Sequence, residues 1–113
     1  MSEKSEASQK IQAMLQVMWK TSRHTIAERI DTLRGAQKSL AEGALDSITR
    51  KQAESAAHKL AGILGTFGLP EGTTLASKIE HLLAQEAGIN PDQQQELAGL
   101  LDGLERQIAT KDQ

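Results

Sequence analysis

Aliphatic side chains recur at intervals of three and four residues along most of this chain of 113 residues. That spacing is the period of an amphipathic α-helix, and no stretch shows the strict alternation of a half-buried β-strand. The chain has one Trp, one Phe and no Tyr, so its core must be built mainly from Ala, Leu and Ile. Helices bury such small aliphatic residues more readily than sheets do, and we expect an all-α protein.

The charge and the residue types exclude several classes of function. A formal net charge of −2 gives no sign of the basic surface that nucleic-acid binding requires. Because the chain has no Cys, it cannot hold a disulfide, a thiolate zinc site or a Cys nucleophile. It has no run of about 18 apolar residues, and its polar start lacks the apolar stretch of a signal peptide. We therefore expect a cytoplasmic protein that binds neither nucleic acid nor membranes.

The apolar positions predict five helices in a single domain, residues 1–113. A short accessory helix is expected at 11–19 and a four-helix bundle at 22–109, while residues 1–10 and 110–113 are expected to be frayed. The N-cap signals are Thr21, Ser22 or Thr25 for the second helix, Asp46 for the third and Asn90 for the fifth. The stop signals are Gly43, Gly68-Leu69-Pro70 and Gly88. Short connections predict an antiparallel up-and-down bundle with the additional N-terminal helix beside it.

The third helix has an unusual outward face. On a wheel at about 100° per residue its apolar side chains cluster within about 60° of one direction, and His58 points almost directly away from it. Glu54, Ala61, Gly62 and Gly65 lie on or beside this outward face. A histidine at such a position is most simply a solvated surface residue.

Gly62 and Gly65 favour a more specific interpretation of His58. They follow it by one and two turns, and each interior glycine costs a helix about 1 kcal/mol relative to Ala. The missing side chains leave the imidazole open to another macromolecule. The glycines could instead allow the accessory helix to pack closely, so a docking face and a packing role both stay open.

The same residues resemble a known family. The pattern consists of Ala57-His58-Lys59-Leu60-Ala61-Gly62, then Gly65-Thr66-Phe67-Gly68-Leu69, then Leu75 and Ile79-Glu80. It is similar to the histidine-containing phosphotransfer (HPt) domain, closely so from Asp46 to Leu83. The resemblance implies an antiparallel four-helix bundle. It also implies that His58 accepts a phosphoryl group from a receiver-domain aspartate and passes it to another receiver.

The resemblance further implies side chains that support His58. In this family a Gln or Glu about twenty-two residues after the His bonds the imidazole, and Glu80 occupies that place. A carboxylate that accepts Nδ1–H leaves the Nε2 lone pair free, although a solvated Glu80 is the simpler alternative. Many members carry Lys three residues after the His, where this chain has Ala61. Lys59 and Lys51 are the available substitutes for neutralising phosphate charge.

Other titratable groups give weaker signals. His81 falls opposite the apolar stripe of its helix, and His24 has no companion glycines. Glu54 and His58 are four residues apart, but two ligands without a third make a poor metal site. The hydroxyl residues near His58 lack a His–carboxylate arrangement, so a hydrolase is not supported. We expect no metal or cofactor bound by this chain.

The sequence therefore predicts a phosphoryl carrier of a two-component phosphorelay, without a complete active site of its own. Receiver domains or a hybrid histidine kinase are the expected partners, and Mg²⁺ is expected on the partner receiver. Two alternatives stay open. The chain could be a non-catalytic docking scaffold with a degenerate HPt fold, or the histidine-bearing domain of a larger histidine kinase.

Overall fold

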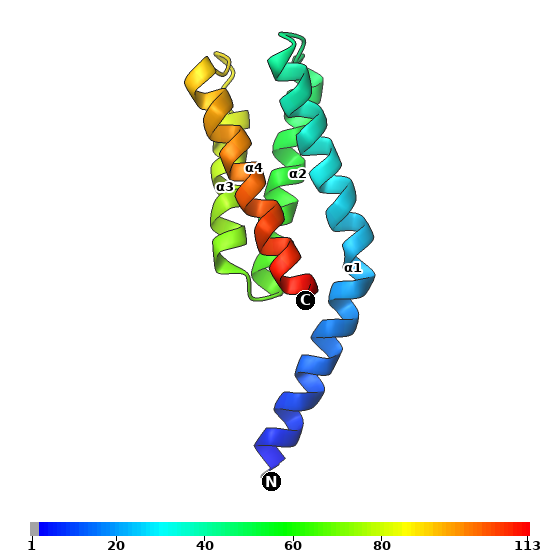
Figure 1. Cartoon of the computed structure of the whole chain (residues 1–113). Helices are drawn as coiled ribbons and strands as arrows, with labels where there is room; N and C mark the ends of the chain where they lie inside the picture. Colours follow the sequence, from blue (N-terminus) through cyan, green and yellow to red (C-terminus); the bar gives the residue numbers. More distant parts are fainter. Residues whose placement is uncertain (1–2) are drawn as a thin grey trace.

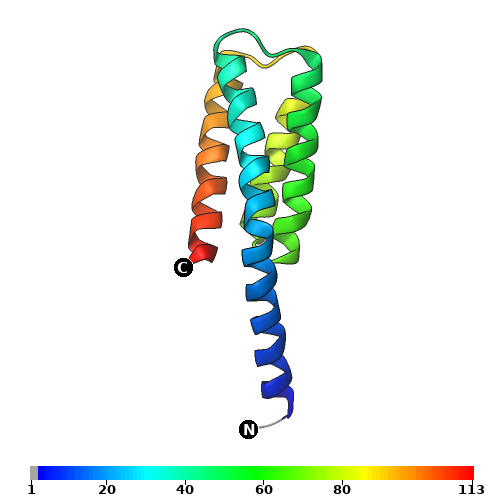
Figure 2. The same ribbon diagram turned by 90° about the vertical axis from the view of Figure 1, so that its right-hand side faces the viewer.

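The structure, a computed structural model, describes residues 3–113. These residues form the α-helices α1 (Glu3–Ala41), α2 (Ser47–Thr66), α3 (Pro70–Leu83) and α4 (Pro91–Asp112). The described part of the chain contains no strand, which confirms the all-helical class. The chain reverses direction at each connection between helices (Figures 1 and 2). None of the described helices is long and apolar enough to cross a membrane.

One core of aliphatic side chains holds the helices together. Its largest fully enclosed side chains come from all of the helices: Ile26, Leu33, Leu60, Leu64, Ile79, Leu83, Leu97, Leu101 and Leu104. Helices α2 and α3 also bury the small residues Ala53, Ala57 and Ala76. Small side chains at a contact let two helix axes approach closely, which brings side chains on the edges of both helices within reach of each other.

The predicted separate helix at 11–19 is wrong, because these residues belong to the same continuous helix as the second predicted one. Thr21, which resembles a cap in the sequence, donates through Oγ1 to the carbonyl of Val17 at 3.0 Å, inside α1. Between Trp19 and Thr25 the chain has no Gly or Pro to end a helix. Trp19 and Ile26 are both buried, so one core-facing side continues through the expected break.

The ends of the chain also differ from the expected frayed segments. Residues 3–10 and 110–112 are helical, whereas residues 1–2 lie outside the described part. Asp112 accepts hydrogen bonds from Trp19 Nε1 at 2.7 Å and from Arg23 Nε at 2.9 Å. These contacts fasten the last turn of α4 to the middle of α1.

Two predicted caps are confirmed. The Asp46 carboxylate accepts a hydrogen bond from the Thr49 N–H at 2.7 Å, which lowers the pKa of Asp46 below its usual value. Asn90 forms a complete capping box with Gln93 at the start of α4. Helix α1 ends two residues before Gly43, which has a φ of 69° that favours glycine. Helix α3 ends at residue 83, earlier than the sequence indicates, and turns lead from there to α4.

The N-terminal half of α1 reaches well beyond the bundle, which gives the molecule extents of 59 × 22 × 21 Å (Figure 1). We call residues 6–18 the N-terminal extension. Leu15 is partly buried against the core, and the other side chains of the extension are exposed. The extension therefore leaves the compact part of the molecule at Trp19.

Candidate phosphoacceptor site

His58 lies in the middle of α2, on the face turned away from the core. Ala57 and Leu60, its neighbours on the helix, are fully buried, whereas 73% of the His58 side chain is exposed. The burial of one face of α2 thus fixes where the imidazole projects. The ring is presented to solvent from a rigid helix rather than from a loop.

Glu80 on α3 reaches across to the same ring. Its carboxylate oxygens lie 3.2 and 3.1 Å from Nδ1 of His58, and its side chain is 28% exposed. When the proton is on Nδ1, the ring donates to the carboxylate and Nε2 keeps its lone pair. The arrangement therefore holds one ring nitrogen and leaves the other available.

Two further contacts fix α3 against α2. Thr73 Oγ1 donates to the carbonyl of Ala61 at 3.0 Å, and Arg50 Nη1 donates to the carbonyl of Leu83 at 2.7 Å. Neither Thr73 nor Arg50 was predicted from the sequence. A usable signal for Thr73 is its position seven residues before Glu80, because residues two turns apart lie on the same side of a helix.

The two glycines that follow His58 have different surroundings. A Cβ atom on Gly62 would meet no heavy atom within 4 Å, whereas one on Gly65 would lie 3.3 Å from Thr73 Oγ1. Packing therefore does not require a glycine at position 62. Gly65 instead leaves room for the Thr73 hydroxyl, so Gly62 and Gly65 serve different purposes.

The other charged residues predicted for the site are not held against His58 as Glu80 is. Lys51 and Lys59 are both exposed on α2, and the partly buried Ala61 offers no charge. The Glu54 carboxylate lies 4.0 Å from Arg50 Nη1, within the same helix. Among the residues that the structure describes, no cluster of three or more His, Asp or Glu side chains could hold a metal ion.

The other two histidines lie in simpler surroundings. Nδ1 of His81 contacts the carbonyl oxygen of Ser77 at 2.8 Å, one turn earlier on its own helix. Nε2 of His24 lies 2.9 Å from the Glu28 carboxylate, and its side chain is 84% exposed. Both contacts stay within one helix, so neither ring is held across two helices as His58 is.

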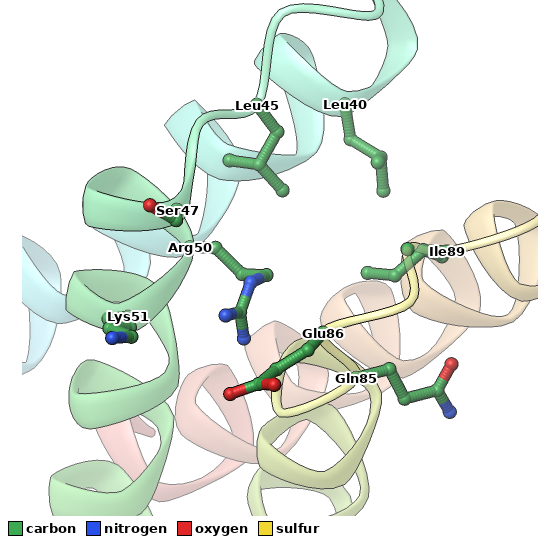
Figure 3. Close-up of a pocket in the computed structure, with 9 residues that line it drawn as sticks. Leu40, Leu45, Ser47, Arg50, Lys51, Gln85, Glu86 and Ile89 are labelled. Carbon is green, nitrogen blue, oxygen red and sulfur yellow. The ribbon is translucent and has the colours of Figure 1, made fainter.

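A groove of about 370 Å³ opens where α2 begins (Figure 3). Leu40, Leu45 and Ile89 contribute apolar side chains to it, while Arg50 of α2 and Glu86 of the α3–α4 connection contribute charged ones. His58 is not among its lining residues. The histidine site is accordingly an open helix face, which suits a reaction completed by a docked partner better than one confined to a pocket.

Comparisons with known proteins place this chain in a family. The family model of the Hpt domain matches residues 13–110. The chain is 27% identical over 104 residues to Protein RcaC of Microchaete diplosiphon; this alignment covers 92% of the chain and 16% of that relative. No solved structure gives a significant match. Since the family match spans most of the chain, including both His58 and Glu80, the chain belongs to the Hpt domain family, which acts in phosphotransfer in two-component signalling.

Proposed function

We propose that this chain is a phosphoryl carrier in a two-component phosphorelay, with His58 as the phosphoacceptor. The observation that carries the proposal is the exposed imidazole whose Nδ1 lies against the Glu80 carboxylate. Membership of the Hpt family supports the class of reaction. The module is an antiparallel four-helix bundle that works in the cytoplasm, and the reversal of direction at each connection supports that topology.

In the proposed forward step, Nε2 of His58 attacks the phosphorus of an aspartyl phosphate on a receiver domain. The Nε2–P bond forms while the P–O bond to the aspartate breaks, and the aspartate leaves as a carboxylate. The proton on Nδ1 stays on the ring, and the positive charge that develops there lies beside Glu80. Transfer to a second receiver reverses these bond changes.

The chain supplies the nucleophile and its orientation, and the partner completes the site. A receiver domain brings the aspartate and Mg²⁺, so the carrier needs no metal site and is not an enzyme by itself. Lys51 and Lys59 are exposed and available to neutralise phosphate charge. The open space at Gly62 leaves room for the partner beside the ring.

The direct test is incubation with phosphorylated receivers and Mg²⁺. The wild type should acquire a label that is labile to acid and stable to base, as expected of a phosphoramidate. His58→Gln should acquire none, and the control His81→Gln should label normally. Undiminished labelling of His58→Gln would place the acceptor elsewhere. If the wild type binds a receiver but stays unlabelled across a panel of receivers, the docking-scaffold alternative is favoured.

A further inference from the structure

Helix α3 ends without the glycine turn that follows each of the two helices before it. Gly43 follows α1 with a φ of 69°, and Gly68 follows α2 with a φ of 73°. After α3, the next glycine with a positive φ is Gly88, well beyond the last residue of the helix. The C-cap residue Ala84 keeps a right-handed conformation, with φ −74° and ψ −11°. The end of α3 is therefore not closed by a glycine in the left-handed conformation.

Arg50 of α2 supplies a partner for this helix end. Its Nη1 donates to the carbonyl of Leu83, the last residue of α3, at 2.7 Å. No backbone N–H of residues 3–113 donates to this carbonyl. A cation at the C-terminal end of a helix is also favoured by the helix dipole. The Arg50 side chain is 12% exposed, so little water competes for the bond, and α3 is capped from the neighbouring helix.

The capped turn is the one that carries Glu80. Glu80 lies three residues before Leu83, and its own carbonyl accepts the Ala84 N–H at 2.9 Å. Its carboxylate lies 3.1 Å from Nδ1 of His58. This contact tolerates little displacement, because a separation of about 3.6 Å is no longer a hydrogen bond. A small movement of the last turn of α3 would therefore release the imidazole.

We propose that Arg50 is a positioning residue for His58 that acts through Glu80. By holding the end of α3 against α2, Arg50 keeps the Glu80 carboxylate at Nδ1, and the ring keeps its proton on that nitrogen. Arg50 itself lies eight residues before His58, about 12 Å along α2. The effect on phosphoryl transfer rests on the proposed function, whereas the effect on the ring is measured in the chain alone.

Thr73 holds the same pair of helices on the other side of Glu80. Its hydroxyl donates to the Ala61 carbonyl, and Thr73 precedes Glu80 by seven residues, or two turns. Arg50 holds a carbonyl within one turn of Glu80, and a hydrogen bond from a charged donor is roughly twice as strong as a neutral one. Loss of Arg50 should therefore release Glu80 further than loss of Thr73.

Amide hydrogen exchange of the full chain tests the cap. In Arg50→Met the Ala84 amide, which donates to the Glu80 carbonyl, should exchange at least about tenfold faster than in the wild type. The Thr73 amide, which donates to the Leu69 carbonyl in the first turn of α3, should change much less. An Ala84 amide with the wild-type exchange rate, or equal acceleration at both amides, would overturn the local role of Arg50.

Nitrogen-15 shifts of the imidazole test the positioning. Arg50→Met should show less of the Nδ1–H tautomer of His58 than the wild type. Arg34→Met is the matched control, because Arg34 also joins two helices but donates from α1 to Asp102 and Glu105 of α4. It should leave the tautomer unchanged. A wild-type tautomer in Arg50→Met, or an equal shift in both variants, would contradict the proposal.

A double-mutant cycle tests the route through Glu80. Arg50→Met should slow phosphotransfer roughly fivefold, because Glu80 still reaches the ring part of the time. In a chain that already carries Glu80→Ala, Arg50→Met should slow transfer no further, because no carboxylate is left to position. Equal proportional losses in both backgrounds would overturn the route. A wild type that accepts no label would count against the proposed function alone, since exchange and tautomer need no receiver.

Arg50→Lys is the milder variant. It keeps a cation but lacks the planar fork of the guanidinium, so it should shift the Ala84 exchange rate and the His58 tautomer in the same direction by less. If Arg50→Met does not fold, wild-type values of both quantities in Arg50→Lys would overturn the proposal.

Discussion

The α1–α4 contact and the α2–α3 contact both place carboxylates against nitrogen side chains, and they do so to different effect. Between α1 and α4, Arg34 donates from Nη2 to Asp102 at 2.8 Å and from Nε to Glu105 at 3.0 Å. The Glu105 hydrogen bond is the main cause that raises the pKa of Arg34. Between α2 and α3, Glu80 engages one nitrogen of His58 and leaves the other unengaged. The first contact fastens two helices, whereas the second also holds the ring that we propose as the phosphoacceptor.

The largest effect is expected when a bulky side chain fills the open space at Gly62, one turn after His58. Gly62→Leu should lower the phosphotransfer rate roughly 100-fold, because a displaced partner loses the geometry of the reaction. Stability should hold or rise, since the space at position 62 is empty and Leu favours a helix. The measurements are transfer kinetics and urea denaturation.

Gly99→Leu is the matched control for the variant at Gly62. Gly99 also lies within a helix, on α4, and a Cβ atom there would meet no heavy atom within 4 Å. This variant should keep the wild-type transfer rate. Equal loss of transfer in both variants would contradict a specific docking role for the surface at Gly62.

A smaller effect is expected when the carboxylate beside the imidazole is removed. Glu80→Ala should slow transfer roughly tenfold, because His58 keeps its nucleophile but loses the group that holds Nδ1–H. Glu80→Gln retains an oxygen acceptor and should recover most of the rate. Nitrogen-15 shifts of the imidazole should show less of the Nδ1–H tautomer in Glu80→Ala. If both variants have the wild-type rate and tautomer, Glu80 does not orient the ring.

At the α1–α4 contact of Arg34 we expect a loss of stability without a change in the transfer rate. Arg34→Met should lower the free energy of unfolding by about 1 kcal/mol, because its ion pairs are partly exposed to solvent. The phosphotransfer rate should not change at protein concentrations and temperatures where the variant is folded. A lower rate in the folded variant would show that the two helix contacts are coupled, and would break the distinction between them.

The smallest effect is expected at Thr73, which fastens α3 to α2, the two helices that carry Glu80 and His58. Thr73→Val removes the hydroxyl that donates to the Ala61 carbonyl and should cost no more than about 1 kcal/mol of stability. Thr73→Ser keeps the donor and should retain more of the stability than Thr73→Val. If the transfer rate in Thr73→Val falls as far as in Glu80→Ala, the position of α3 controls the imidazole more strongly than the carboxylate does.

Local signals in the sequence were sufficient for some helix ends and misleading for others. The caps at Asp46 and Asn90 were predictable because each side chain bonds an N–H only three residues away. Thr21 carries the same type of hydroxyl, but here the hydroxyl bonds a carbonyl one turn earlier within α1. The absence of Gly and Pro between Trp19 and Thr25 hints at the continuous helix, but its clearest sign is the burial of Trp19 and Ile26 on one face, which depends on the other helices.

Side-chain contacts also differ in how far the sequence reveals them. The spacing of His58 and Glu80 was visible in the sequence through the family resemblance, and the structure brings the two side chains together. The contact of Arg34 with Asp102 joins residues 68 positions apart, so it depends on how α1 and α4 are aligned along their lengths. The different surroundings of Gly62 and Gly65 likewise depend on where Thr73 lies. A sequence pattern alone does not contain that alignment.

The short connection at residues 67–69 means that α2 and α3 form a single helical hairpin. His58, Glu80, Thr73 and Gly62 all belong to it, while α1 and α4 pack against it. The residues proposed for phosphoryl transfer and the Arg34 ion pairs are therefore encoded in separate stretches of the gene. We expect mutations at the Arg34 ion pairs to change stability alone, whereas mutations around His58 and Glu80 alter the proposed transfer directly. This separation lets evolution adjust the stability of the bundle without altering the proposed transfer.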